Sequence, residues 1–158
     1  MAKKIKAKSL YRIGVVVKDA DATAAKFAEY FEIDESKKMV VDTSQYKHDD
    51  FYHYDRKVDF DMKLVIFPLG GIEIELIEPL DNRGPYAEWL RNHGEGLHHF
   101  NIEVDDNKNF QKAMEELNVP LLTGGYLDDL KLGWKYFESY APFKMVYEIC
   151  QEEPFEDL

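Results

Sequence analysis

The stretch that decides the fold spans residues 94–106: Gly94-Glu95-Gly96-Leu97-His98-His99-Phe100-Asn101-Ile102-Glu103-Val104-Asp105-Asp106. It is typical of a glycine turn, then a strand, then the start of a helix. A shorter echo lies near the N-terminus, at Tyr11-Arg12-Ile13-Gly14-Val15-Val16-Val17-Lys18-Asp19. Overlaying the two places Arg12 on His99, and a helix-like run follows both. We therefore predict an internal repeat, which fixes the architecture and the location of any active site.

Each half of the chain is predicted to form a strand, a helix and three further strands, in that order. In the first half we expect strands at 10–17, 38–41, 62–67 and 72–77 and a helix at 21–31. In the second half we expect strands at 98–104, 119–122, 134–139 and 144–150 and a helix at 107–117. Residues 42–59 lack a clear period and are expected to be a loop or partly a strand. Gly70-Gly71 and Gly124-Gly125 are predicted to be turns.

We expect a single domain over residues 1–158. Its predicted parts are module one at about 9–80, a connecting helix at about 84–92, module two at about 97–150 and an acidic tail at 151–158 with little fold of its own.

Composition excludes several classes of function. The 158 residues carry a formal net charge of −11, which would repel a nucleic-acid backbone. No apolar run is long enough to cross a bilayer, so we expect no membrane partner. The lysine-rich start is not followed by an apolar segment, and we expect a cytoplasmic location. Cys150 has no partner for an intrachain disulfide and is predicted to be a buried, inert thiol.

Polar side chains interrupt the apolar strands at a few positions, and burying them is costly without a partner or a task. Glu75 and Glu148 lie in the last strand of their halves, whereas Arg12 and His99 lie in the first. The repeat should therefore bring the four together, and one imidazole with two carboxylates suits a divalent metal. The competing interpretations are a structural histidine at a strand end and two glutamates on the surface.

These residues resemble the vicinal oxygen chelate superfamily, which includes glyoxalases, dioxygenases, bleomycin-resistance proteins and methylmalonyl-CoA epimerases. The resemblance covers about residues 9–150 and is strongest to the epimerases, through residues 74–80, 94–99 and 103–106. It implies an α+β fold of paired βαβββ modules forming one cleft, and a homodimer. It also implies a small organic or acyl-thioester ligand and one divalent metal per chain (Zn, Ni, Co, Mn or Mg). The implied metal ligands are position 12, Glu75, His99 and Glu148.

Arg12 departs from the family pattern, which usually has histidine at this position. A guanidinium only donates hydrogen bonds and stays protonated, so it cannot ligate a metal. Either Arg12 swings away and leaves a three-ligand site, or it replaces the metal by pairing with Glu75 and Glu148. We favour the metal-free arrangement slightly. His98, one residue out of phase with His99, is expected to point to the opposite face of the sheet.

The resemblance also implies the chemistry. The leading hypothesis is an isomerase or lyase of the epimerase or glyoxalase type, which abstracts a proton next to a carbonyl. Glu148 would be the base, Asp59 the second acid/base group, and Arg12 or a metal would stabilise the enolate. Arg12, Glu75 and His99 would contact the ligand. The alternative is a non-catalytic, metal-free protein that sequesters a small ligand, and for Asp59 the competing interpretation is a plain loop acid.

Overall fold

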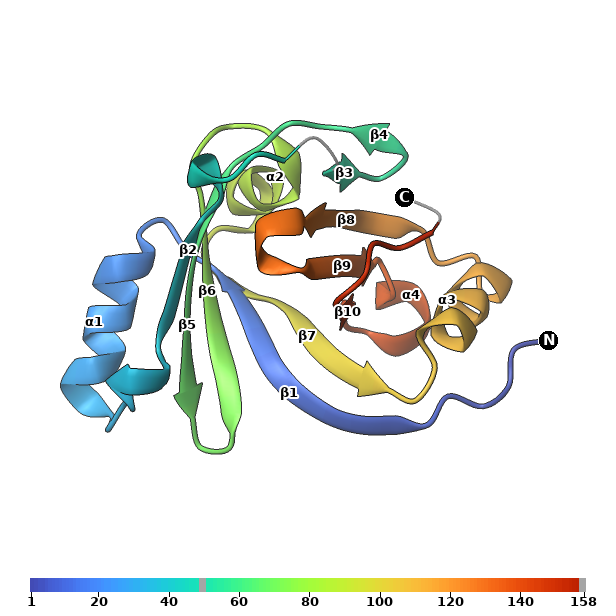
Figure 1. Cartoon of the computed structure of the whole chain (residues 1–158), viewed down its shortest axis with the longest axis horizontal. Helices are drawn as coiled ribbons and strands as arrows, with labels where there is room; N and C mark the ends of the chain where they lie inside the picture. The colour runs from blue at the N-terminus through green and yellow to red at the C-terminus, as the bar shows by residue number, and fades with distance from the viewer. Residues whose placement is uncertain (49–50, 157–158) are drawn as a thin grey trace.

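The computed structural model describes residues 1–48 and 51–156. In these residues the strands form one mixed sheet with the order β2-β5-β6-β1-β7-β10-β9-β8-β3-β4, which curls into a half-barrel (Figure 1). The strands are β1 (Ala7–Val16), β2 (Met39–Asp42), β3 (Tyr52–His53), β4 (Arg56–Lys57), β5 (Met62–Leu69), β6 (Ile72–Pro79), β7 (Gly96–Val104), β8 (Leu121–Leu127), β9 (Leu132–Phe137) and β10 (Tyr147–Gln151). The helices are α1 (Ala20–Tyr30), α2 (Gly84–His93), α3 (Asn107–Glu116) and α4 (Tyr140–Phe143), with single 3-10 turns at Glu35–Lys37, Thr43–Gln45 and Asp128–Leu130.

The first strands of the two halves, β1 and β7, are antiparallel neighbours in the middle of this sheet (Figure 1). β6 runs parallel to β1, and β10 runs parallel to β7 in the same way. In register, Gly14 lies beside Glu75, and Asn101 lies beside Glu148. The halves are thus related by an approximate twofold axis between β1 and β7. The predicted α+β fold of paired βαβββ modules is confirmed.

The helices begin where the sequence supplies N-caps. Asp19 accepts a hydrogen bond from the Ala22 backbone N–H at 2.8 Å, and Asp106 accepts one from Asn109 at 2.9 Å. α2 has proline in its first turn and ends at Gly94, whose φ of 77° favours glycine. No helix in the described part of the chain is long and apolar enough to span a membrane.

The main hydrophobic core fills the inside of the curved sheet with side chains from both halves. Large aromatic residues dominate it, namely Phe51, Phe60, Tyr86, Trp134 and Tyr136. Smaller cores lie between the outer face of each half and its helix, one under α1 and one under α3. The inside of the half-barrel is therefore largely packed, which limits where a ligand can enter.

The prediction that Gly124-Gly125 is a turn was wrong. Both residues lie within β8, where Gly124 pairs with β3 and β9. A Cβ at Gly125 would lie 2.7 Å from ring atoms of both Phe51 and Trp134, so glycine is needed for close packing.

The C-terminal segment is more ordered than the sequence indicates. Phe155 is 5% exposed and joins the core under α3, and Lys135 Nζ lies 4.9 Å from the centre of its ring. Residues 157–158 of the predicted tail lie outside the described residues. In the uncertain segment 42–59, β3 pairs with β8 and with β4, and residues 49–50 lie outside the described part.

Candidate functional site

Three of the predicted site residues converge on one point inside the sheet. His99 Nε2 lies 3.0 Å from Glu148 Oε2 and 3.4 Å from Glu75 Oε2. His99 is completely buried, and each glutamate is 4% exposed. Glu75, His99 and Glu148, here called the triad, come from β6, β7 and β10. The interpretations that placed the two glutamates on the surface do not fit this burial.

The close approach of the triad depends on Gly14 of β1, which is paired with His99 across the central strands. A Cβ at Gly14 would lie 1.9 Å from His99 Cε1 and within 2.4 Å of both ring nitrogens. Its backbone is not in a conformation that demands glycine, so the reason for glycine is space. The imidazole occupies the volume that any side chain at position 14 would need.

Arg12 lies beside the triad but is held mainly by another residue. Its Nε and Nη2 donate to Glu73 Oε2 at 2.9 and 2.7 Å, whereas Nη1 lies 3.5 Å from Glu75 Oε1. Glu73 alternates with Glu75 on β6, and its side chain is 41% exposed. The guanidinium therefore turns toward Glu73 and leaves Glu75, His99 and Glu148 facing one another.

Each charged group of the triad stabilises the charged form of its neighbours. Burial alone would lower the pKa of His99, but Glu148 and then Glu75 favour the protonated ring and raise its pKa to about 9. Burial alone would raise the pKa of Glu75, but His99 and then Arg12 hold it below its ordinary value. Without a metal, the site thus holds an imidazolium between carboxylates.

The same atoms fit a divalent metal. The triad offers one nitrogen and two carboxylate oxygens that all lie within 4.8 Å of one another. The ring N–H at His99 Nε2 points toward Asn101 Oδ1 at 3.1 Å. As a result Oε2 of Glu75 and Oε2 of Glu148 are close to the ring but receive no aligned hydrogen bond, and both atoms are buried. Buried acceptors without donors, grouped around an imidazole, suit a divalent metal ion.

The prediction for His98 was wrong, because a β-bulge changes the alternation of β7. The register shifts between the pairs Gly14–His99 and Val15–Leu97, which leaves His98 as the extra residue. The ring of His98 is buried on the inner side, and its Nδ1 lies 3.0 Å from His99 Nδ1. Burial, and then the charges of His99 and His93, lower the pKa of His98 well below its ordinary value. A neutral His98 can therefore accept a hydrogen bond from His99 Nδ1–H.

The structure places Asp59 in an exposed loop shortly before β5. Its carboxylate pairs with Arg83 Nη1 at 3.3 Å and lies 3.9 Å from His48 Nδ1. Its side chain is 71% exposed, so this conformation does not bring it to the buried triad.

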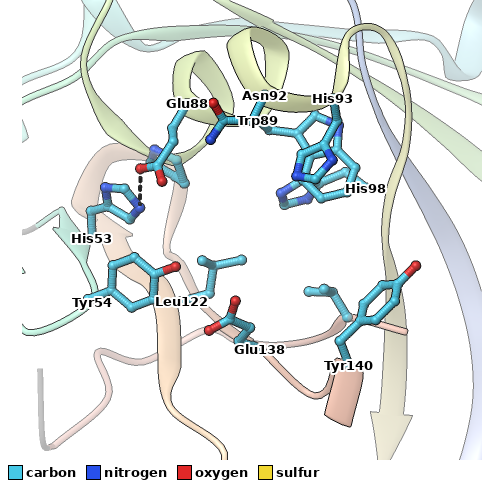
Figure 2. A pocket seen from close by; sticks show the side chains of 12 residues that line it. His53, Tyr54, Glu88, Trp89, Asn92, His93, His98, Leu122, Glu138 and Tyr140 are labelled. Carbon is cyan, nitrogen blue, oxygen red and sulfur yellow. Dashed lines mark ion pairs between the residues drawn. The ribbon is translucent and has the colours of Figure 1, made fainter. Parts of the chain in front are cut away.

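Two hollows lie near the triad without including it. A cavity of about 450 Å³ lies between α2, β3 and α4, and His98 forms part of its wall (Figure 2). A smaller hollow of about 210 Å³ reaches Tyr11 and Cys150. Cys150 Sγ is 3.5 Å from Glu148 Oε1, so one residue separates this hollow from Glu148. Burial raises the pKa of the Cys150 thiol well above its ordinary value, as expected for an inert cysteine.

Sequence reasoning missed the residues that support the triad. Asn101 hydrogen-bonds His99 Nε2, and the ring of Tyr136 packs edge-on to His99 with the centroids 4.4 Å apart. The repeat carried a signal for two of them, since Gly14 and Asn101 occupy equivalent positions in the two echoes. No local pattern distinguishes Tyr136 from other core aromatics.

Comparisons with known proteins agree with this geometry. Residues 11–136 match the sequence model of the Glyoxalase/Bleomycin resistance protein/Dioxygenase superfamily. A search of curated proteins finds no significant match.

Among solved structures, methylmalonyl-CoA epimerase from Mycobacterium tuberculosis is 17% identical with a TM-score of 0.62, over 98% of this chain and 93% of that one. The Streptomyces coelicolor epimerase in complex with 2-nitronate-propionyl-CoA is 15% identical with a TM-score of 0.63, over 96% and 97%. The hypothetical protein BH1468 from Bacillus halodurans C-125 is 18% identical with a TM-score of 0.61, over 99% and 98%. At these identities the similarity demonstrates a shared fold.

Proposed function

Because this chain belongs to the glyoxalase/bleomycin resistance protein/dioxygenase superfamily, we propose that it is an isomerase or lyase of the epimerase or glyoxalase type. Such an enzyme removes a proton from the carbon next to a carbonyl group. The observation that supports this most is the burial of Glu75, His99 and Glu148 around a shared centre with unsatisfied carboxylate oxygens. Charged groups are seldom buried together in this way without a bound ion or a chemical task.

Glu148 is the proposed base, because its two oxygens face different neighbours. Oε2 faces His99 at 3.0 Å, and Oε1 faces the Cys150 thiol at 3.5 Å on the side of the smaller hollow. Oε1 is therefore the atom that would take the proton from a substrate entering beside Tyr11 and Cys150. A divalent ion held by Glu75, His99 and Glu148 would supply positive charge for the carbonyl oxygen.

Arg12 offers a second means of stabilising an enolate. Its guanidinium is next to Glu75, and its side chain is 14% exposed, so it lies between the triad and solvent. An anionic substrate oxygen would exchange with the half-exposed Glu73 carboxylate at Nε and Nη2. Asp59 remains the proposed second acid/base group, and it would have to leave Arg83 to act. An acyl thioester is the proposed substrate class, with support from the solved complex of a relative with 2-nitronate-propionyl-CoA. A homodimer in the cytoplasm completes the proposal.

The test combines metal content with proton exchange. Protein purified without chelator should contain about one divalent ion per chain by elemental analysis. It should catalyse deuterium uptake at the α-carbon of a short acyl-CoA or a hemithioacetal. Glu148→Gln should abolish exchange, whereas Glu29→Gln, which changes an exposed glutamate on α1 that lines neither hollow, should leave it intact. If the unmodified protein contains no metal and catalyses no exchange, the proposal that it is an enzyme is refuted.

A second candidate is a metal-free protein that binds a small ligand without reaction. The positive charge of the buried His99 ring, whose pKa is raised to about 9 beside Glu148 and Glu75, favours it, because the ring balances part of the charge of the two carboxylates without a metal. Tight binding of an unreactive ligand by protein free of metal would support this candidate over the first.

A further inference from the structure

We propose that the cavity between α2, β3 and α4 is a binding site for a small organic cation. It is separate from the triad, because Glu75, His99 and Glu148 are not among its lining residues, and it does not depend on the proposed proton transfer. Its volume of about 450 Å³ lies within the range of small-ligand sites.

The carboxylates of the cavity wall disfavour anions. Glu88 extends from α2 and Glu138 from the segment after β9; Figure 2 shows the Glu138 carboxylate directed toward the open middle and the Glu88 carboxylate beside His53 at the rim. The described lining includes neither lysine nor arginine. The remaining basic side chains of the lining are the imidazoles of His53, His93 and His98, and burial lowers the pKa of His53. The phosphates of coenzyme A would therefore be repelled here.

Aromatic side chains supply the rest of the recognition. Tyr54, Trp89 and Tyr140 are spaced around the same opening as the two carboxylates (Figure 2). The faces of such rings attract ammonium groups, and quaternary ammonium compounds are recognised by sets of aromatic rings. Carboxylates and aromatic faces around one hollow select a positively charged ligand with an apolar body.

Part of the wall is fixed before any ligand arrives. His53 Nε2 pairs with Glu88 Oε2 at 3.3 Å, and the rings of Trp89 and His98 pack edge-on with the centroids 4.8 Å apart. The Glu138 side chain is exposed at the opposite wall and is available to meet a cation. A preformed wall with one accessible carboxylate reduces the ordering that binding would otherwise require.

The test uses two probes of similar size and opposite charge, benzyltrimethylammonium and phenylacetate. The quaternary ammonium has no lone pair, so it cannot bind through a metal at the triad. Binding is followed by tryptophan fluorescence, since Trp89 lines the cavity and Trp134 lies in the core. We expect saturable quenching by the cation and none by the anion, and Trp89→Phe should remove the signal.

Substitution then separates a site from a general effect of the acidic surface. Glu138→Gln should weaken cation binding about three- to tenfold. Glu152→Gln removes the same charge from an exposed position outside the cavity and should change it little. The proposal is overturned if phenylacetate binds equally well, if Glu138→Gln has no effect, or if neither probe binds at about 10 mM. Metal content and deuterium exchange are measured in separate experiments. Failure of the cation site and failure of the proposed enzyme can therefore be distinguished.

Discussion

The position most sensitive to a small change is Gly14. Replacing it with alanine puts a methyl carbon 1.9 Å from His99 Cε1, closer than any van der Waals contact allows. The neighbouring β1–β7 backbone is in the middle of the sheet and cannot retreat, so the imidazole must leave its place between Glu75 and Glu148. Two buried carboxylates would then lose their cationic partner.

The magnitude follows from two opposing terms. Overpacking together with the loss of a buried ion pair costs about 3 kcal/mol of unfolding free energy, more than the roughly 0.5 kcal/mol that alanine gains in a compatible backbone. The net loss is about 2.5 kcal/mol, so with a urea m-value of about 2 kcal/mol per molar the midpoint should fall by about 1.2 M. Urea unfolding in chelator, followed by circular dichroism, measures this in the metal-free chain.

The matched control is the same substitution in a His99→Ala background. There the methyl group enters space that the imidazole has vacated, so Gly14→Ala should be nearly neutral and the two changes should couple by about 3 kcal/mol. An equal cost of Gly14→Ala in both backgrounds would show that His99 does not depend on the space at position 14. A cost below about 0.5 kcal/mol in the unmodified chain would refute the packing argument as well.

Three further predictions concern pH, the arginine and the C-terminal segment. The pKa of His99 is about 9 in the folded chain and 6.5 ordinarily, so its ion pairs stabilise the metal-free chain fully below pH 6.5. This stabilisation is lost as the pH rises through 9. Urea midpoints should therefore fall between pH 6.5 and 9, and they should fall less in His99→Gln. Arg12→His replaces a repelling cation with a metal ligand and should tighten zinc binding at least tenfold. Competition with a chromophoric chelator measures the affinity. An unchanged affinity would mean that Arg12 does not weaken metal binding at the site. Phe155→Ala should cost about 3 kcal/mol in urea unfolding because the ring is 5% exposed, whereas a loss below about 1 kcal/mol would mean that the segment is not docked.

The sequence predicted the main lines of the fold and the grouping of four site residues. The repeat places Arg12 and His99 on equivalent strands, and apolar neighbours indicated that Glu75 and Glu148 face inward. Glu75 and Glu148 follow the alternation of β6 and β10, which is visible in one sequence, whereas β7 departs from alternation at His98.

What the sequence did not predict depends on contacts between distant segments. The bulge that turns His98 inward inserts one residue without any local signature. The pairing of Arg12 with Glu73 depends on which of two glutamates the guanidinium reaches once β1 and β6 are aligned. Gly125 was predicted to lie in a turn, because the sequence does not show why glycine is required there. The requirement comes from the rings of Phe51 and Trp134, which belong to two other parts of the chain.

Gly14 and Asn101 occupy equivalent positions in the two halves but differ in size, so the two halves are not interchangeable. A symmetric protein made of two copies of the second half would set an asparagine amide inside the volume of each imidazole. Two copies of the first half would bring two guanidinium groups together and supply no imidazole. A fully symmetric version of this protein would therefore need a residue without a side chain opposite each imidazole, or its centre would have a different composition.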